Sequence, residues 1–192
     1  MRVFIGIDLD DTWRAALRAG CETIRRTDPA WHDEKWVPGE NLHMTLKFMG
    51  DVPDESVEYL GPDLEKALGD SRSFSLPVAR LVYPAPERRK ATMLWTTFRD
   101  PDDAAASLLS RIEDVAADYG VVPESRFFNP HVTLVRARRP HPFTAEEPAL
   151  AAMASVLGPI DSMSVGEVTV FSSTLTRATP VYRRLAKIRL TD

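Results

Sequence analysis

The sequence of 192 residues contains a single cysteine, only four histidines and no long hydrophobic run. Because Cys21 has no second cysteine to pair with, an intrachain disulfide and a cysteine-based zinc site are both excluded. No apolar run approaches the roughly 20 residues that span a bilayer. The short apolar run at the N-terminus is ended at once by acidic residues, unlike a signal peptide. We therefore expect a cytoplasmic protein with no membrane partner.

The net charge argues against broad, non-specific binding of nucleic acid. A net charge of −4 is unfavourable for a protein coated broadly and non-specifically by nucleic acid. It still allows a local basic groove, for which the segments ERRK at 87–90 and RARR at 136–139 are candidates. With 44% hydrophobic and 27% charged residues, the chain has the composition of an ordinary globular domain.

Hydrophobic periodicity predicts an α+β protein. Alternating or continuous apolar runs predict seven strands, at 3–9, 41–48, 74–82, 92–98, 131–137, 163–172 and 181–190. Helical spacing predicts four helices: one between Asp10 or Asp11 and Asp28, one after Pro53, one from Asp100 to Gly120, and one over 146–156. Strands outnumber helices and several follow one another directly, which favours antiparallel pairing.

Two of the four histidines stand in the same tetrapeptide. His43-Met44-Thr45-Leu46 and His131-Val132-Thr133-Leu134 both read His-x-Thr-Leu. Composition alone would produce such a coincidence in about 3 chains per 10,000. The two motifs divide the chain into halves that each contain helix and strand. We expect residues 1–192 to form a single domain of two pseudo-symmetric lobes, with the motifs 43–46 and 131–134 facing one another.

On a strand, the first and third residues of each motif share one face. His43, Thr45 and Lys47 are then expected on one side of the first strand, and the aliphatic residues between them on the other. The second motif places His131 and Thr133 together in the same way. Each strand would bury an aliphatic face and present an imidazole and a hydroxyl group.

Two such strands across a cleft suit phosphoryl chemistry. A neutral histidine can accept a proton from a nucleophile while a protonated one gives a proton to the leaving oxygen. Threonine hydroxyls can bind the non-bridging phosphate oxygens. Zinc binding is the alternative reading of paired histidines. However, His32 and His141 lie in unrelated contexts and no HxH, HxxxH or HExxH pattern occurs, so we expect neither metal nor cofactor.

The motif blocks resemble those of the two-histidine (2H) phosphoesterase superfamily. Within it, the chain is similar to the RNA 2′,3′-cyclic phosphodiesterases, also called the 2′-5′ RNA ligase family. The similar segments follow the order of the family and cover most of the chain: RVFIGIDL, WVPGENLHMTLKFMGDV, FFNPHVTLVR and FSSTLTRATPVYRRL. Met44 and Met49 stand where leucine is more usual.

The resemblance implies a bilobal antiparallel α+β fold with helices outside and the active site in a central cleft. It implies hydrolysis of an RNA 2′,3′-cyclic phosphodiester to a 2′-phosphomonoester without metal or cofactor. His43 would be the proton donor to the 3′-oxygen and His131 the proton acceptor that activates water. Thr45 and Thr133 would bind phosphate oxygens. The residues alone define an acid/base pair; which histidine has which role rests on the resemblance.

Four further residues are candidates for substrate binding. Arg136 has the offset at which the family often has a phosphate-binding arginine, but strict alternation places it on the face opposite His131 unless the strand bulges. Lys47 is on the expected face. Phe128 and Trp36 are candidates for stacking on a base, with core packing as the alternative.

Three functions fit these observations. The first is an enzyme acting on RNA with a 2′,3′-cyclic phosphate terminus, with reversible 2′-5′ ligation as a side activity. The second is a phosphoesterase for a small cyclic nucleotide, another small cyclic phosphate or a 2′-5′ oligonucleotide. The third is a non-catalytic RNA-end binding protein, which would have no need of two titratable groups. One chain carries both motifs, so a monomer is expected.

Overall fold

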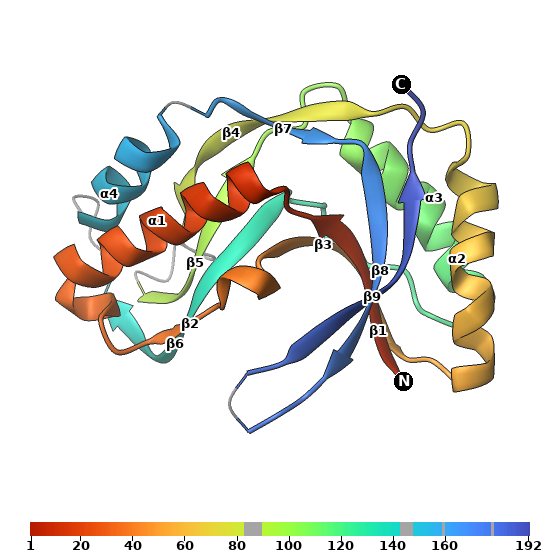
Figure 1. The fold of residues 1–192 in the computed structure, drawn as a ribbon, viewed down its shortest axis with the longest axis horizontal. Helices are drawn as coiled ribbons and strands as arrows, with labels where there is room; N and C mark the ends of the chain where they lie inside the picture. Colours follow the sequence, from red (N-terminus) through yellow and green to blue (C-terminus); the bar gives the residue numbers. More distant parts are fainter. Residues whose placement is uncertain (83–89, 143–147, 159, 178) are drawn as a thin grey trace.

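The computed structural model describes residues 1–82, 90–142, 148–158, 160–177 and 179–192 (Figure 1). In chain order the elements are β1 (Arg2–Asp8), α1 (Asp11–Thr27), the 3-10 helix η1 (Pro29–Trp31), β2 (Lys35–Trp36), the 3-10 helix η2 (Gly39–Asn41), β3 (His43–Asp51), α2 (Asp54–Leu68), β4 (Phe74–Val82), β5 (Lys90–Phe98), α3 (Ala104–Asp118), β6 (His131–Pro142), α4 (Pro148–Leu157), β7 (Ser162–Val165), β8 (Glu167–Thr174) and β9 (Val181–Arg189). The predicted α+β class is confirmed. The segment ERRK at 87–90 lies outside the described residues except for Lys90.

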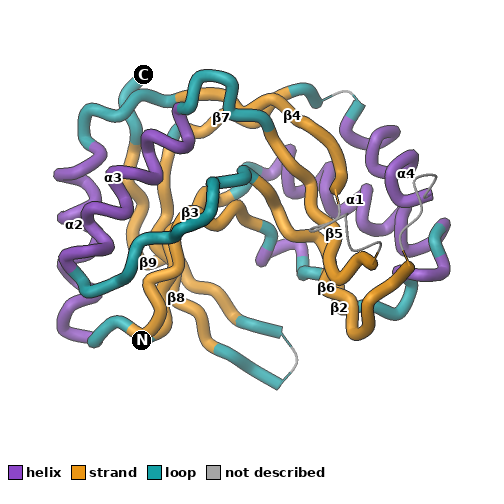
Figure 2. The backbone as a smooth tube through the Cα atoms, turned by 180° about the vertical axis from the view of Figure 1, so that it is seen from behind, coloured by secondary structure: helices purple, strands orange, loops and turns teal. Residues whose placement is uncertain are grey.

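The strands in the described ranges form one curled antiparallel sheet in the order β7-β4-β5-β6-β3-β1-β8-β9, with β2 added beside β6. The first four strands of this order lie in one lobe and the last four in the other. Helices α1 and α4 pack together on the first lobe, and α2 and α3 on the second (Figures 1 and 2). This is the predicted bilobal arrangement with helices outside.

The two lobes meet at the strands that carry the histidine motifs. β3 and β6 share a single registered pair, Met44 with Val132. A second connection runs through β7 and β8, which are separated only by Gly166. β7 pairs with β4 in one lobe, whereas β8 pairs with β1 in the other. The motif strands are therefore central in the sheet.

Helix ends follow local capping chemistry, with one difference from expectation. Asp10 is the N-cap of α1, and its carboxylate accepts from the Trp13 amide at 2.7 Å. The helix predicted to run from Asp100 begins instead at Ala104, as α3. The Asp100 carboxylate still accepts from the amides of Ala105 and Ala106, at 3.1 and 2.9 Å. A turn thus separates the capping side chain from the helix that it caps.

The helices cover the face of the sheet that carries the aliphatic residues of both motifs. Met44, Val132 and Leu134 are completely buried there, together with Ile5 of β1. This burial is the main source of stability that fixes the orientation of the motif strands, since a one-residue slip would expose every one of these side chains. In the described ranges, no helix is long and apolar enough to cross a membrane.

Candidate active site

The two motifs present their histidines and threonines on the same face of the sheet, opposite the helices. Because Met44 and Val132 are paired and point into the core, the residues on either side of them point away from it. This face, which carries His43, Thr45, His131 and Thr133, is called the histidine face below. An antiparallel pair has a local two-fold relation, so each histidine lies toward the other strand's threonine.

Both imidazoles are held in the same way. The Nδ1 atom of His43 lies 2.7 Å from the carbonyl oxygen of Asn41, and that of His131 lies 2.7 Å from the carbonyl oxygen of Asn129. A carbonyl oxygen can only accept, so Nδ1 carries the hydrogen in both rings. Each neutral imidazole therefore keeps the lone pair of Nε2 for chemistry. In His43, this atom lies 3.0 Å from Thr45 Oγ1, whose hydroxyl group donates to it.

Aromatic rings surround His43. Its ring centroid lies 4.7 Å from that of Phe4 and 5.2 Å from that of Tyr182, which it meets edge-on. Phe171 stacks on Phe4 at 4.8 Å. The resulting desolvation lowers the pKa of His43 from 6.5, while the nearby Asp8 carboxylate opposes this shift. His43 is thus a half-buried imidazole with one favourable negative charge beside it.

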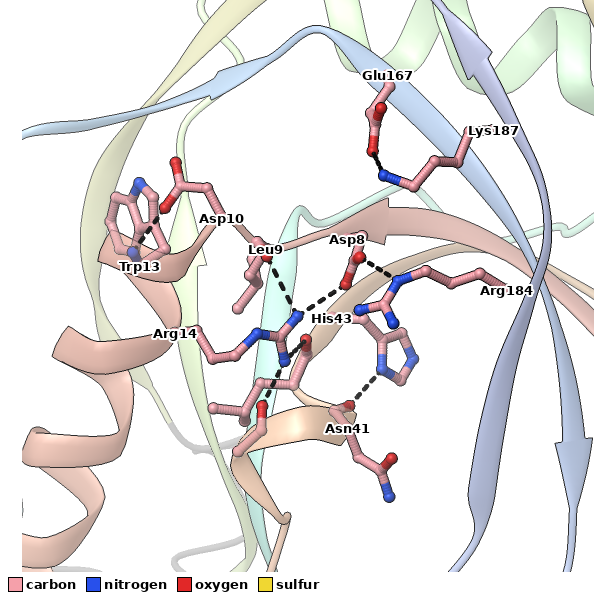
Figure 3. A network of polar contacts seen from close by, with 12 residues as sticks. Asp8, Leu9, Asp10, Trp13, Arg14, Asn41, His43, Glu167, Arg184 and Lys187 are labelled. Carbon is pink, nitrogen blue, oxygen red and sulfur yellow. Dashed lines mark hydrogen bonds and ion pairs between the residues drawn. The ribbon is translucent and has the colours of Figure 1, made fainter.

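Asp8, the neighbour of His43 across the sheet, forms ion pairs with arginines from both lobes (Figure 3). It is the cross-strand partner of His43, so both side chains lie on the histidine face. Its carboxylate accepts from Arg14 Nη2 at 2.7 Å and from Arg184 Nε at 2.5 Å. Arg14 also donates to the carbonyl oxygens of Gly39 and Leu42, just before the motif. The Asp8 network therefore ties α1, β9 and the entry to β3 together.

His131 has a different environment. The ring of Trp95, from β5, stacks on it at a centroid distance of 3.8 Å and an interplanar angle of 26°. Burial lowers the pKa of His131 from 6.5, and the positive charge of Arg136 lowers it further. The same guanidinium also lowers the pKa of His43. The charge of Arg136 therefore acts on both imidazoles, although the residue is far from the first motif in sequence.

A bulge in each motif strand explains the position of Arg136. Trp95 pairs with Thr133 and Leu94 with Val135, so Leu134 is an extra residue without a partner. Leu46 is extra in the same way, between Thr45 and Lys47. A bulge reverses the alternation of side chains beyond it. Arg136 consequently lies on the histidine face, and so does Phe48, which occupies the matching place after Leu46.

The same bulge makes the predicted orientation of Lys47 wrong. Lys47 lies on the helix face, 2% exposed, with Nζ 2.6 Å from a carboxylate oxygen of Glu113 on α3. Nζ also donates to the carbonyl oxygen of Val122 at 2.9 Å. Strict alternation had placed it beside His43, but the unpaired Leu46 turns it to the other side. Lys47 is a structural tie between β3 and α3 rather than a substrate contact.

Of the two predicted stacking residues, Trp36 does not lie with the histidines. Trp36 pairs with the buried Val135, and cross-strand partners point to the same face, so its indole lies on the helix face. Its Nε1 donates to the Trp31 carbonyl oxygen at 2.9 Å. The prediction for Trp36 is therefore wrong. Phe128 is half-buried against the core, while its neighbour Phe127 is fully exposed.

The other two histidines lie apart from this site. His32 is exposed and contacts Asp33. His141 belongs to β6, and its Nε2 lies 2.7 Å from a carboxylate oxygen of Glu34. Among the residues that the structure describes, no group of three or more His, Cys, Asp or Glu side chains is placed to hold a metal ion.

Several residues of the histidine face were not among the predicted site residues, including Asp8, Phe48, Trp95 and Tyr182. Comparison of the two motifs could have found one of them, since Phe48 and Arg136 both stand two residues after the motif leucine. The others come from strands β1, β5 and β9, and they approach the histidines only through sheet pairing. No local pattern in the sequence indicates such pairing.

Comparisons with known proteins show what the whole chain is similar to. A family model described as the 2′-5′ RNA ligase superfamily matches residues 12–177. The RNA 2′,3′-cyclic phosphodiesterase of Methanothermobacter thermautotrophicus is 28% identical over 193 residues, covering 99% of each chain. The enzyme of the same name from Escherichia coli is 27% identical over 202 residues, covering 100% of this chain and 97% of its own. The crystal structure of E. coli LigT in apo form superposes with a TM-score of 0.74 at 25% identity, covering 100% and 98%.

Proposed function

Because the chain belongs to the 2′-5′ RNA ligase superfamily, we propose that it hydrolyses RNA 2′,3′-cyclic phosphodiester ends to 2′-phosphomonoesters. The observation that carries the proposal is the pair of imidazoles on one face of the sheet, each with Nδ1 fixed by a backbone carbonyl. Relatives that match over nearly their whole length carry the name of this activity. The proposed site contains both an acid and a base within one chain.

In the proposed reaction, Nε2 of His131 takes a proton from water as the water oxygen attacks phosphorus. The bond from phosphorus to the 3′-oxygen breaks, and Nε2–H of His43 gives its proton to that oxygen. The product has a 2′-phosphate and a free 3′-hydroxyl group. Both histidines return to their starting states by proton exchange with solvent.

The charges around the rings support this division of roles. Asp8 raises the pKa of His43 and so favours the protonated form that an acid needs. His131 has no carboxylate among the causes of its shift, and Arg136 lowers its pKa toward the neutral form that a base needs. Burial lowers both values in the free protein, and an anionic phosphate would raise them when it binds.

The remaining polar groups are proposed to bind the phosphate. The hydroxyl groups of Thr45 and Thr133 can donate to its non-bridging oxygens, and the Arg136 guanidinium can neutralise the charge that grows in the transition state. Phe128 stays a candidate for contact with a base. No step calls for a metal ion. Run in reverse, the same proton transfers would join a 2′-phosphate to a hydroxyl group, so we include 2′-5′ ligation as a side activity.

We also propose that residues 1–192 act as one domain and as a monomer in the cytoplasm. Both motifs, and the Asp8 network that supports His43, come from a single chain. Light scattering at micromolar concentration would test the monomer. A mass twice that of the 21.5-kDa chain would contradict it.

A product assay tests the reaction. An oligoribonucleotide with a 2′,3′-cyclic phosphate end is incubated with the protein in EDTA, and the position of the product phosphate is then mapped. A 2′-phosphate end is expected for the wild type and for His32→Ala, whose histidine is exposed and outside the site. A 3′-phosphate product would contradict the proposed regiochemistry, and activity only after addition of a metal would contradict the mechanism.

The same assay separates the alternatives. Turnover of a small cyclic nucleotide without turnover of the oligonucleotide would indicate a small-molecule phosphoesterase. Tight binding of the oligonucleotide end without turnover of either substrate would indicate a binding protein.

A further inference from the structure

Arg184 of β9 has an anchored guanidinium group with unused donors on the histidine face. Its Nε donates to Asp8 at 2.5 Å, and its side chain makes no other hydrogen bond or ion pair with the residues that the structure describes. Its cross-strand partner is Phe171, whose ring stacks on Phe4, so Arg184 lies on the same face as these rings. The N–H groups of both Nη atoms are therefore available to an acceptor on the histidine face.

Among the described residues, one positive charge around Asp8 is not balanced, because this carboxylate pairs with both Arg14 and Arg184. The hydrogen bond to Asp8 and the charge of Glu167 both raise the pKa of Arg184. Glu167, however, is itself paired with Lys187 at 2.5 Å. The side chain of Arg14 is 18% exposed and that of Arg184 is 48% exposed. Arg184 therefore presents the surplus charge to solvent, which favours an anion there.

The strand order places Arg184 and Arg136 on opposite sides of the histidine pair. His131, His43 and Asp8 lie on the successive strands β6, β3 and β1, which are spaced about 4.8 Å apart. Because Arg184 binds Asp8, its guanidinium group lies beyond His43, on the side away from His131. Besides burial, the charge of Arg136 lowers the pKa of both imidazoles, and Arg184 is not among the causes of either shift. Arg184 thus lies outside the position proposed for the reacting phosphate, which is between the two rings.

The connectivity of ribose indicates which anion an RNA end has at this place. The C3′ atom is bonded to C4′, which carries the 5′ phosphodiester arm, whereas C2′ is bonded to C1′, which carries the base. A terminal nucleotide whose 3′-oxygen lies at His43 therefore extends its 5′ phosphodiester toward the side of the site where Arg184 lies. A cyclic mononucleotide has no such phosphodiester.

We propose that Arg184 binds the phosphodiester on the 5′ side of the nucleotide that carries the cyclic phosphate. This inference rests on the proposed function and deepens it, because the contact favours RNA ends over small cyclic nucleotides. Asp8 holds the guanidinium group at Nε, so the fork of Nη atoms is oriented before the substrate binds and little side-chain entropy is lost. Arg184 is then a specificity-determining residue, whereas Arg136 binds the reacting phosphate.

The test compares two substrates that end in the same 2′,3′-cyclic phosphate. Adenylyl-(3′→5′)-adenosine 2′,3′-cyclic phosphate has one phosphodiester on the 5′ side, and adenosine 2′,3′-cyclic phosphate has none. The wild type is expected to have the higher kcat/KM on the dinucleotide. For Arg184→Gln, the ratio of kcat/KM on the dinucleotide to kcat/KM on the mononucleotide should fall about 10-fold, the size of a lost hydrogen bond to a charged group. Any effect through Asp8 and His43 lowers both values equally and cancels in the ratio.

Salt dependence provides a second readout. In Arg184→Gln, the logarithm of kcat/KM on the dinucleotide should fall less steeply with the logarithm of salt concentration, by about 0.7, since one phosphate contact of a single strand is lost. Arg183→Gln is the matched control, because it removes the same charge from the adjacent position. Arg183 pairs with Ser172, whose other partner is the buried Val3, so it lies on the face opposite Arg184. Its ratio and its salt dependence should equal those of the wild type.

A wild type without preference for the dinucleotide, or an unchanged ratio in Arg184→Gln, would overturn the proposal, since Arg184 would then act only through Asp8. An equal fall of the ratio in Arg183→Gln would overturn it too, because the effect would then be one of general charge. If the wild type turns over neither substrate, the proposed function fails, and the phosphate site is then tested by binding. Arg184→Gln should lower the affinity for adenylyl-(3′→5′)-adenosine 2′-phosphate about 10-fold relative to that for adenosine 2′-phosphate. An equal change of both affinities would overturn the inference in that case.

Discussion

The two histidine motifs share a backbone but differ in surroundings. Both have an asparagine carbonyl that holds Nδ1, a threonine on the same face and a bulged leucine after it. Around His43 lie aromatic rings and Asp8, whereas His131 stacks on Trp95 beside Arg136. Equal geometry with unequal electrostatics is what an acid/base pair requires, because the two rings must be in opposite protonation states.

The largest expected effect comes from removing either imidazole. His43→Ala and His131→Ala should each lower kcat on an RNA 2′,3′-cyclic phosphate by about 10²- to 10⁴-fold, the usual contribution of general acid or base catalysis. The double variant should be little slower than either single one, because the two groups act as a unit. Steady-state kinetics of the purified variants measures this.

Thermal unfolding provides the control for both variants. Each histidine side chain is on the face opposite the helix-covered core, so the folded state should persist, with a cooperative transition by circular dichroism. If one single variant kept full activity, the two-histidine mechanism would be wrong and the comparison between the motifs would lose its meaning.

A smaller effect should separate the roles of the two rings. Asp8→Asn removes the negative charge that raises the pKa of His43, so this pKa should fall further below 6.5. If His43 is the acid, the alkaline limb of the kcat/KM profile moves to lower pH, and activity above neutrality falls. The pH dependence of kcat/KM measures this, since it reports groups of the free enzyme.

Movement of the acid limb instead would assign the base to His43 and reverse the proposed roles. Glu167→Gln is the matched control. It removes a carboxylate that pairs with Lys187 at 2.5 Å, but Glu167 is not among the causes of the shift of His43. Its profile should coincide with that of the wild type.

The smallest effect on turnover is expected at Lys47, the position in β3 that corresponds to Val135 in β6. Lys47→Met removes the partner of the mostly buried Glu113 and should destabilise the fold by about 3 kcal/mol. The kcat/KM of the folded fraction should be unchanged, because Nζ lies on the helix face. Urea unfolding and kinetics on the same sample measure both quantities.

A second substitution tests the cause of that instability. Lys47→Met with Glu113→Leu should recover most of the stability, because no unpaired charge remains in the core. A loss of kcat/KM at unchanged stability would contradict the structural role of Lys47 and would indicate that its side chain contacts the substrate.

Much of the fold and the centre of the site could be predicted from the sequence, because periodicity and the repeated motif are local signals. The spacing of His43 and Thr45 fixes a shared face as long as the strand is regular, and the structure keeps both residues together. The amphipathic pattern after Asp10 likewise predicts α1 and its cap. These features depend on neighbours within a few residues.

The predictions fail where pairing with another strand interrupts the regular alternation of side chains or brings distant residues together. Lys47 was placed on the wrong face because the bulge at Leu46 is visible only in the register with β1. Trp36 was misplaced because β2 joins the sheet beside Val135, about a hundred positions away in sequence. From the sequence, Asp8 was predicted only to lie on a strand. Its position beside His43 depends on the same β1–β3 register.

The segment of β7 and β8, joined at Gly166, affects how far the two lobes can move relative to each other. A single registered pair between β3 and β6 would by itself behave as a hinge, free to open and to change the separation of the two imidazoles. The continuous segment β7-Gly166-β8 connects the two lobes at a second place, and this connection restricts rotation about the β3–β6 pair. We therefore expect the two imidazoles to keep the same separation before and after a substrate binds.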